Sequence, residues 1–164
     1  MSTQPNLADT LTITTPSDRE ARMTRVFAAP RELVFRACTE PALVSQWMLG
    51  PEGWTMPVCE IDLQPGGKWH HVWRKSSGTE MSMTGTYLEV DPPARIVSTE
   101  RWGPEWPETT NTILFTERNG QTTLTTTILY PSKEARDIAM KTGMTDGATS
   151  SYNRLEAVLY TLSK

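Results

Sequence analysis

Apolar residues recur at every second position in several short stretches of the chain, which is the pattern of half-buried β-strands. Residues 18–28 show it first, where Ala21, Met23 and Phe27 alternate with polar side chains. From 58 to 130 similar stretches follow one another, and many are rich in β-branched residues, which favour strands. The pattern predicts one strand near the start and six between residues 58 and 130.

Turn residues separate these predicted strands. Pro65 and Gly66 occupy the centre of a QPGG turn, and a type II turn favours glycine at its second central position because φ is positive there. Asn119 and Gly120 form the strongest short hairpin signal between two strand-like runs. Consecutive strands are therefore predicted to pair as a meander.

The spacing of apolar residues changes to three and four in the remaining segments, which indicates helices. Pro30 stands where a first helical residue belongs, and Thr39 can cap a second short helix. Ser132 is expected to cap a third helical segment that Gly143 ends. The last helix carries an apolar stripe made of Met144, Ala148, Ser151, Leu155, Val158, Leu159 and Leu162.

This order of elements predicts an α+β fold. An antiparallel sheet with one long C-terminal helix must bury the apolar stripe of the helix on one face of the sheet. Two short helices would close one end, and a sheet curled around a long helix leaves a space between them. We predict a flexible tail over residues 1–17 and a single domain over residues 18–164.

Composition narrows the function classes. The 164 residues fit one domain, and the net charge of −3 offers no basic face for nucleic acid. The N-terminus lacks the pattern of a signal peptide, and no apolar stretch is long enough to span a bilayer. We expect a cytoplasmic protein in which Cys38 and Cys59 are reduced.

The stretch KWHHVWRK places two indoles and two imidazoles on one predicted strand. Successive strand side chains point to opposite faces, so Trp69, His71 and Trp73 share one face whereas His70 lies on the charged face. The two histidines therefore cannot chelate one ion, and no Cys, Asp or Glu lies at a ligand spacing nearby. No metal site is predicted.

The aromatic face fits either a packed core or the wall of a ligand cavity. On the next strand, apolar residues again alternate with polar ones, and Gly85 leaves space beside them. Indole and thioether groups line adaptable pockets well, and a buried imidazole must be hydrogen-bonded or reach a cavity. The predicted wall consists of Trp69, His71, Trp73, Met81, Met83, Tyr87 and Met144, with Trp47 and Trp54 near the entrance.

The sequence contains none of the common hydrolase, metalloprotease, P-loop or dinucleotide-binding motifs. Glu100 and Glu105, near Trp102 and Trp106, either border a surface loop or lie at a pocket mouth. His71 has the chemistry of a general acid or base, but no second group is convincingly paired with it. We predict no catalytic residue and no cofactor.

Several motifs together resemble one known family. In order, they are APRELVFRACTEP, WMLGPEGW, DLQPGGKW, PPARIVSTE and the C-terminal GMTDGATSSYNRLEAVL. They are similar to bacterial homologues of the activator of the heat-shock-protein-90 ATPase, which belong to the START-like, polyketide-cyclase-related (SRPBCC) superfamily. The resemblance implies a helix-grip fold, in which an antiparallel sheet wraps around the C-terminal helix and encloses an apolar cavity.

The chain departs from the family pattern at two places. The family often has two tryptophans before the Gly-Pro pair, where this chain has Trp47, Met48 and Leu49. It often has Gly-Trp in the last helix, where this chain has Gly147 and Ala148. The smaller Ala148 is expected to enlarge or reshape the cavity, so the ligand cannot be transferred from relatives.

Three functions stay open on the sequence. The leading hypothesis is a module that binds an apolar or aromatic small molecule or a lipid. The second is a protein that stimulates a heat-shock ATPase. The third is an enzyme of the cyclase, dehydratase or hydrolase type, as some superfamily relatives are. The oligomeric state also stays open: a homodimer fits a protein of this size, and no residue of the sequence indicates its interface.

Overall fold

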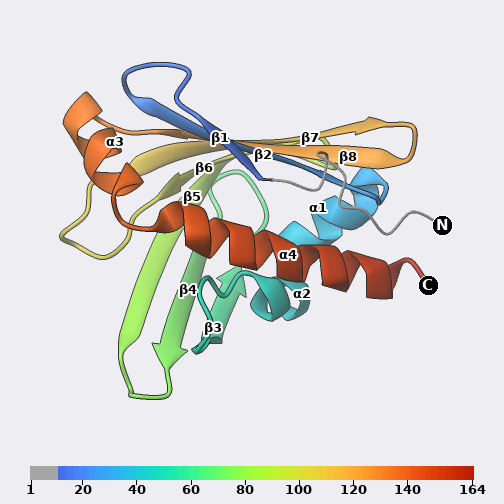
Figure 1. Cartoon of the computed structure of the whole chain (residues 1–164), viewed down its shortest axis with the longest axis horizontal. Helices are drawn as coiled ribbons and strands as arrows, with labels where there is room; N and C mark the ends of the chain where they lie inside the picture. Colours follow the sequence, from blue (N-terminus) through green and yellow to red (C-terminus); the bar gives the residue numbers. More distant parts are fainter. Residues whose placement is uncertain (1–10) are drawn as a thin grey trace.

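A curved antiparallel sheet wraps around the C-terminal helix α4, Met144–Leu162 (Figure 1). The computed structural model describes residues 11–164. Its strands are β1 (Thr12–Thr14), β2 (Glu20–Phe27), β3 (Trp54–Ile61), β4 (Lys68–Lys75), β5 (Glu80–Asp91), β6 (Arg95–Glu100), β7 (Thr109–Arg118) and β8 (Gln121–Leu129). Their order in the sheet is β1-β2-β8-β7-β6-β5-β4-β3. The predicted α+β, helix-grip architecture is confirmed.

Three further helices lie within the described residues. Helices α1 (Arg31–Thr39) and α2 (Pro41–Trp47) follow β2, and α3 (Lys133–Met140) precedes α4. Helix α2 lies beside α4 near β3 (Figure 1). No helix in this part of the chain has the length and apolar character needed to cross a membrane.

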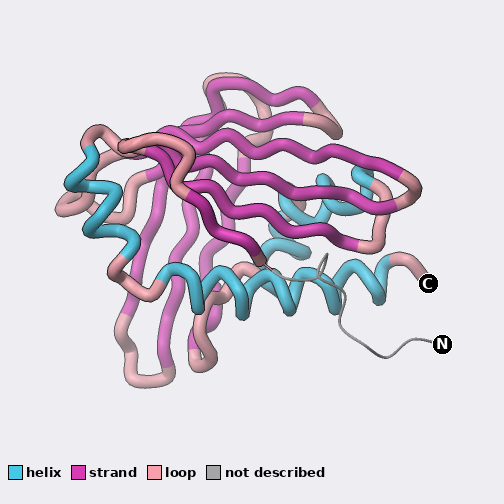
Figure 2. The backbone as a smooth tube through the Cα atoms, turned by 45° about the horizontal axis from the view of Figure 1, so that its top comes forward, coloured by secondary structure: helices cyan, strands magenta, loops and turns pink. Residues whose placement is uncertain are grey.

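The two sides of the sheet run in different directions. Strands β3 to β5 cross the layer of β2, β8 and β7 at a steep angle, so the sheet folds over α4 (Figure 2). The register of β5 against β6 shifts between Tyr87 and Glu89, and such a bulge bends and twists a strand. This bend gives the sheet its concave face.

The two predicted turns are confirmed. Gly66 has a φ of 84°, and the amide of Gly67 donates to the carbonyl of Gln64 at 2.8 Å, as a tight turn requires. Asn119 and Gly120 have φ values of 55° and 78°, the pair of positive angles that defines a type I′ hairpin.

The predicted helix caps have different outcomes. The hydroxyl of Ser132 accepts a hydrogen bond from the amide of Ala135 at 3.0 Å, so that cap is confirmed. The predicted cap at Thr39 is wrong, because Thr39 is the last residue of α1 and its hydroxyl donates to the carbonyl of Phe35 at 2.7 Å. Helix α2 instead begins with Pro41 as its first residue, a position that proline favours.

The predicted tail extends too far into the chain. Residues Thr12–Thr14 form the edge strand β1, which pairs with β2. This strand was missed because three residues are too few for an alternating pattern. The prediction for residues 1–10 lies outside the described residues.

The concave face of the sheet carries the main core. Phe27 of β2, Phe115 of β7 and Leu155 of α4 are among its fully buried side chains. Arg25 of β2 is also buried on this face, where its guanidinium donates to Asn153 Oδ1 at 2.7 Å and pairs with a carboxylate of α4. This charged contact ties β2 to α4 and was not predicted.

Candidate functional site

Five predicted wall residues lie together on the concave face. Trp69, His71 and Trp73 of β4 and Met83 and Tyr87 of β5 are each at most 7% exposed. His71 stands opposite Met83 in the ladder between the two strands. The prediction from alternation, that the indoles and the imidazole between them turn inward, is therefore confirmed.

The aromatic side chains of this wall form one continuous row. The ring of His71 lies 4.9 Å from that of Trp69 and 5.7 Å from that of Trp73. Trp102, from the loop after β6, stacks on Trp73 with ring centroids 5.2 Å apart. The indole N–H of Trp73 donates to the carbonyl of Met48 at 2.7 Å, which fixes that end of the row.

Gly85 does not leave empty space beside the wall. It stands opposite Trp69 in the ladder between β4 and β5, and a Cβ at Gly85 would collide with the Trp69 indole and the Thr99 carbonyl. The indole therefore fills the space that the sequence predicted to be open. Glycine is required here because another backbone and a large ring both approach closely.

Two of the predicted methionines do not join this wall. Met81 is 44% exposed, since it lies near the start of β5 beyond the covered part of the sheet. Met144 packs in a second cluster with Tyr130, whose hydroxyl donates to its sulfur at 3.9 Å. Strand alternation and helix spacing give the face of each residue, but not its distance from the centre of the core.

The two tryptophans predicted near an entrance have separate structural roles. Trp47 is buried, stacks on Tyr152 at 5.9 Å and donates to the carbonyl of Ala37 at 2.8 Å. Trp54 is partly buried and lies under the ammonium group of Lys75, 5.1 Å from the ring centroid. Trp47 therefore belongs to the core, which corrects its predicted position.

The imidazole of His71 is buried without full hydrogen bonding. The side chain is 5% exposed, and its Nδ1 has no partner among the residues that the structure describes. Burial lowers the pKa of His71 to about 4, because a charged imidazolium loses its hydration there. His71 is therefore neutral near pH 7 and keeps one ring nitrogen available for another group.

Replacing His71 by leucine is expected to reduce the acid sensitivity of the fold. The pKa of His71 falls from its ordinary value of 6.5 to about 4 in the folded protein, so the unfolded state binds the extra proton first. Stability is then lost as the pH falls from about 6.5 to about 4, by on the order of 3 kcal/mol. Urea unfolding of the native protein and of His71→Leu across this pH range measures the difference. If the free energy of unfolding depended on pH in the same way in both proteins, the lowered pKa of His71 would be contradicted.

Glu100 is a polar group of the concave face that was predicted to lie at a surface loop or a pocket mouth. It is the last residue of β6, not part of a loop rim. One carboxylate oxygen accepts from the indole N–H of Trp102 at 3.0 Å and the other from the amide of Asn111 at 2.7 Å. Burial raises the pKa of Glu100 to about 7. Ile96, Ser98 and Glu100 alternate along β6, so strand parity was the signal that could have placed Glu100 on the concave face.

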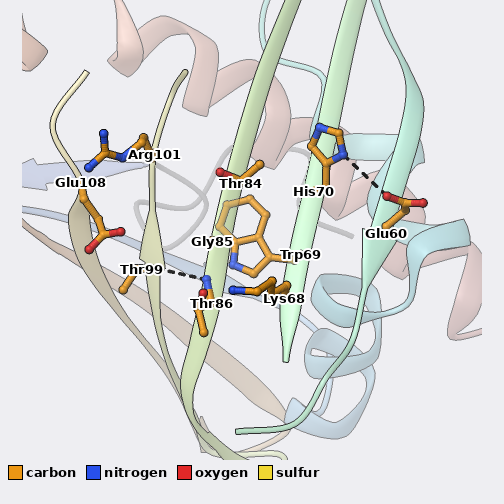
Figure 3. Close-up of a pocket in the computed structure, with 10 residues that line it drawn as sticks. All are labelled: Glu60, Lys68, Trp69, His70, Thr84, Gly85, Thr86, Thr99, Arg101 and Glu108. Carbon is orange, nitrogen blue, oxygen red and sulfur yellow. Dashed lines mark hydrogen bonds and ion pairs between the residues drawn. The ribbon is translucent and has the colours of Figure 1, made fainter. Parts of the chain in front are cut away.

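The opposite face of the sheet carries an open groove of about 400 Å³ (Figure 3). Its lining includes Glu60, Lys68, His70 and Arg101. His70 Nε2 is hydrogen-bonded to the hydroxyl of Ser82 at 3.0 Å, and its Nδ1 lies 3.6 Å from a carboxylate oxygen of Glu60. Within residues 11–164, no group of three or more His, Cys, Asp or Glu side chains could hold a metal ion.

Comparisons with known proteins agree with this architecture. A family model described as "Activator of Hsp90 ATPase homolog 1-like protein" matches residues 28–160. A crystal structure of a protein from Rhodobacter sphaeroides is 28% identical with a TM-score of 0.88, and the match covers 92% of this chain and 98% of that one.

Two further solved structures are similar. A protein from Nitrosomonas europaea is 26% identical with a TM-score of 0.80, over 90% of this chain and 97% of that one. A protein from Staphylococcus epidermidis is 27% identical with a TM-score of 0.79, over 92% and 94%. No curated protein matches the chain. Because the family model matches most of its length, the chain belongs to the family of activator of Hsp90 ATPase homolog 1-like proteins.

Proposed function

We propose that the protein binds an apolar or aromatic small molecule or lipid between the concave face of the sheet and α4. The observation that carries this proposal is the buried His71 Nδ1, which has no partner among the described residues inside a wall of indole rings. A buried polar atom left unpaired costs about 1–3 kcal/mol. A ligand with a hydrogen-bonding group regains that free energy, and its apolar body contacts the rings.

We infer that α4 moves on binding, since the groove beside Glu60 and His70 and the pocket beside Trp106 and Ile138 both open to the surface away from α4. All the buried residues of α4 lie between Ser151 and Leu159, and none lies in its first two turns. These first two turns, Met144 to Ser150, are therefore the part of α4 whose local unfolding costs the least free energy, since segments with few buried side chains open most easily. Met83 and the tryptophans then adapt to the ligand, as thioethers and indoles do in other adaptable pockets.

Titration of tryptophan fluorescence with a panel of aromatic and apolar compounds tests the proposal. At least one compound is expected to saturate the signal. His71→Leu should lower the affinity for that compound about tenfold, because one buried hydrogen bond is lost. His70→Leu is the matched control, because His70 lies on the opposite face with its own partners, and it should leave the affinity unchanged.

Two results would count against this function. A flat response of the native protein to every compound would overturn it. A loss of affinity in His70→Leu with none in His71→Leu would place the ligand on the outer face, in the groove beside Glu60 and His70, and not under α4.

One observation favours a second candidate, the stimulation of a heat-shock ATPase. Trp102, Trp106 and Ile138 are large apolar side chains that are exposed at the surface, and Trp106 and Ile138 line a common pocket of about 300 Å³. Exposed apolar groups of this kind mark docking surfaces. An assay of a bacterial heat-shock ATPase tests it: stimulation that Trp106→Ser abolishes would support it, and unchanged hydrolysis at saturating protein would end it.

A further inference from the structure

The carboxyl group of Glu100 faces the interior without a cationic partner. Both of its hydrogen-bond partners, Trp102 and Asn111, are neutral. The ion pairs within residues 11–164 do not include Glu100. Arg25 is a buried cation of the same face, but its guanidinium is bonded to Asn153 and Glu156 of α4. Glu100 is partly buried, and a carboxylate withdrawn from water gains from a cationic partner, which Glu100 lacks among the described residues.

Aromatic rings connect this carboxyl group to His71. The indole N–H of Trp102 donates to Glu100, and its ring stacks on Trp73. The ring of His71 then lies between those of Trp73 and Trp69. The site therefore combines one acidic group, several ring faces and a neutral imidazole. Ammonium groups are attracted both by carboxylates and by the faces of indole rings.

We propose that the interior site is selective for organic cations: a ligand with an aromatic or aliphatic body and one ammonium group. The ammonium group pairs with Glu100, the body lies against Trp69 and Trp73, and His71 Nδ1 bonds a second polar atom where the ligand has one. This assignment rests on the proposed function and adds the chemical class of the ligand. It predicts that a carboxylate ligand of the same shape is rejected, because it would face Glu100.

Three naphthalene probes of similar shape separate charge from apolar contact. Naphthylethylamine is a cation at neutral pH, naphthylethanol is neutral and naphthylacetate is an anion. Isothermal titration calorimetry at about pH 8 is expected to give an affinity for the amine about tenfold above that for the alcohol, since a hydrogen bond to a charged group is worth at least this factor. Naphthylacetate should bind more weakly than the alcohol.

The variant Glu100→Gln tests the residue assignment. It should abolish the preference for the amine and keep the affinity for the alcohol, which also shows that the variant is folded. Glu60→Gln is the matched control, because Glu60 is a mostly exposed glutamate beside the outer groove, and it should keep the preference.

A pH series on the native protein tests the same point without any substitution. The pKa of Glu100 is about 7, and a cation binds its ionised form, so the affinity for the amine should rise about tenfold from pH 6 to pH 8. The pKa is about 12 for Tyr130, Tyr152 and Cys38, about 11 for Cys59 and about 4 for His71. Burial also raises the pKa of Tyr87, so all these groups stay neutral from pH 6 to pH 8. Naphthylethanol should bind equally at both pH values.

The outcomes distinguish the two claims. Equal affinities for the amine and the alcohol, or a preference that Glu100→Gln leaves intact, would overturn cation selectivity and leave the proposed function standing. The absence of binding by all three probes would overturn both claims.

Discussion

Leu155→Ala is expected to lower the free energy of unfolding by about 3 kcal/mol. Leu155 is fully buried in α4, within the core that the concave face of the sheet encloses. Removing three buried carbon atoms forfeits their transfer free energy and leaves a cavity, which together cost about 2–5 kcal/mol at such sites. Urea denaturation followed by circular dichroism measures the change.

Leu88→Ala is the matched control for this prediction. Leu88 is 49% exposed and lies at the register shift of β5, so its truncation should cost less than about 1 kcal/mol. If the two alanine variants lost the same stability, α4 would not be packed on the sheet as described.

Gly85→Ala and Gly147→Ala are expected to change stability in opposite directions. A Cβ at Gly85 meets the Thr99 carbonyl and the Trp69 indole, so we expect a loss of about 2 kcal/mol from overpacking and a changed near-ultraviolet circular dichroism signal from the displaced indole. A Cβ at Gly147 meets only Pro51 Cδ, at 3.6 Å, and the Cα of Gly50, at 3.9 Å. In the interior of α4, this substitution should stabilise the protein by about 0.5–1 kcal/mol.

Thermal and urea unfolding of the two glycine variants decides the point. A neutral Gly85→Ala would mean that Trp69 does not lie against β5 and that the space beside Gly85 is open after all. A destabilising Gly147→Ala would mean that the loop at Gly50 presses more tightly on α4 than these contacts indicate.

Local patterns were sufficient to predict most of the architecture. The period of two placed Trp69, His71 and Trp73 on one face, because strand side chains alternate regardless of what they pack against. The turn at Gly66 and the hairpin at Gly120 were predicted because their backbone angles favour glycine. These features depend on neighbouring residues, which the sequence gives directly.

Features that depend on distant parts of the chain were not predictable in this way. Met81 lies on the correct side of β5 but is exposed, because its burial depends on how far the covering elements reach. Trp47 is buried by stacking on Tyr152, more than a hundred residues later. Glu100 was expected at a surface loop or a pocket mouth, because charged residues rarely face a core; its partial burial depends on Trp102 and on Asn111 of β7.

Shared architecture leaves the ligand undetermined, because function belongs to the site and not to the fold. The wall around His71 and the acidic group at Glu100 are properties of this chain's own residues. The expectation that Ala148 enlarges the space under α4 stays a prediction, which the size dependence of ligand affinity can test.

A crystal structure of the protein soaked with naphthylethylamine tests the central claim most directly. We expect electron density for the probe between β4 and α4, with its ring beside Trp69 or Trp73 and its ammonium group within hydrogen-bonding distance of Glu100. Density for the probe only in the outer groove beside Glu60 and His70, with the interior filled by protein side chains, would contradict it.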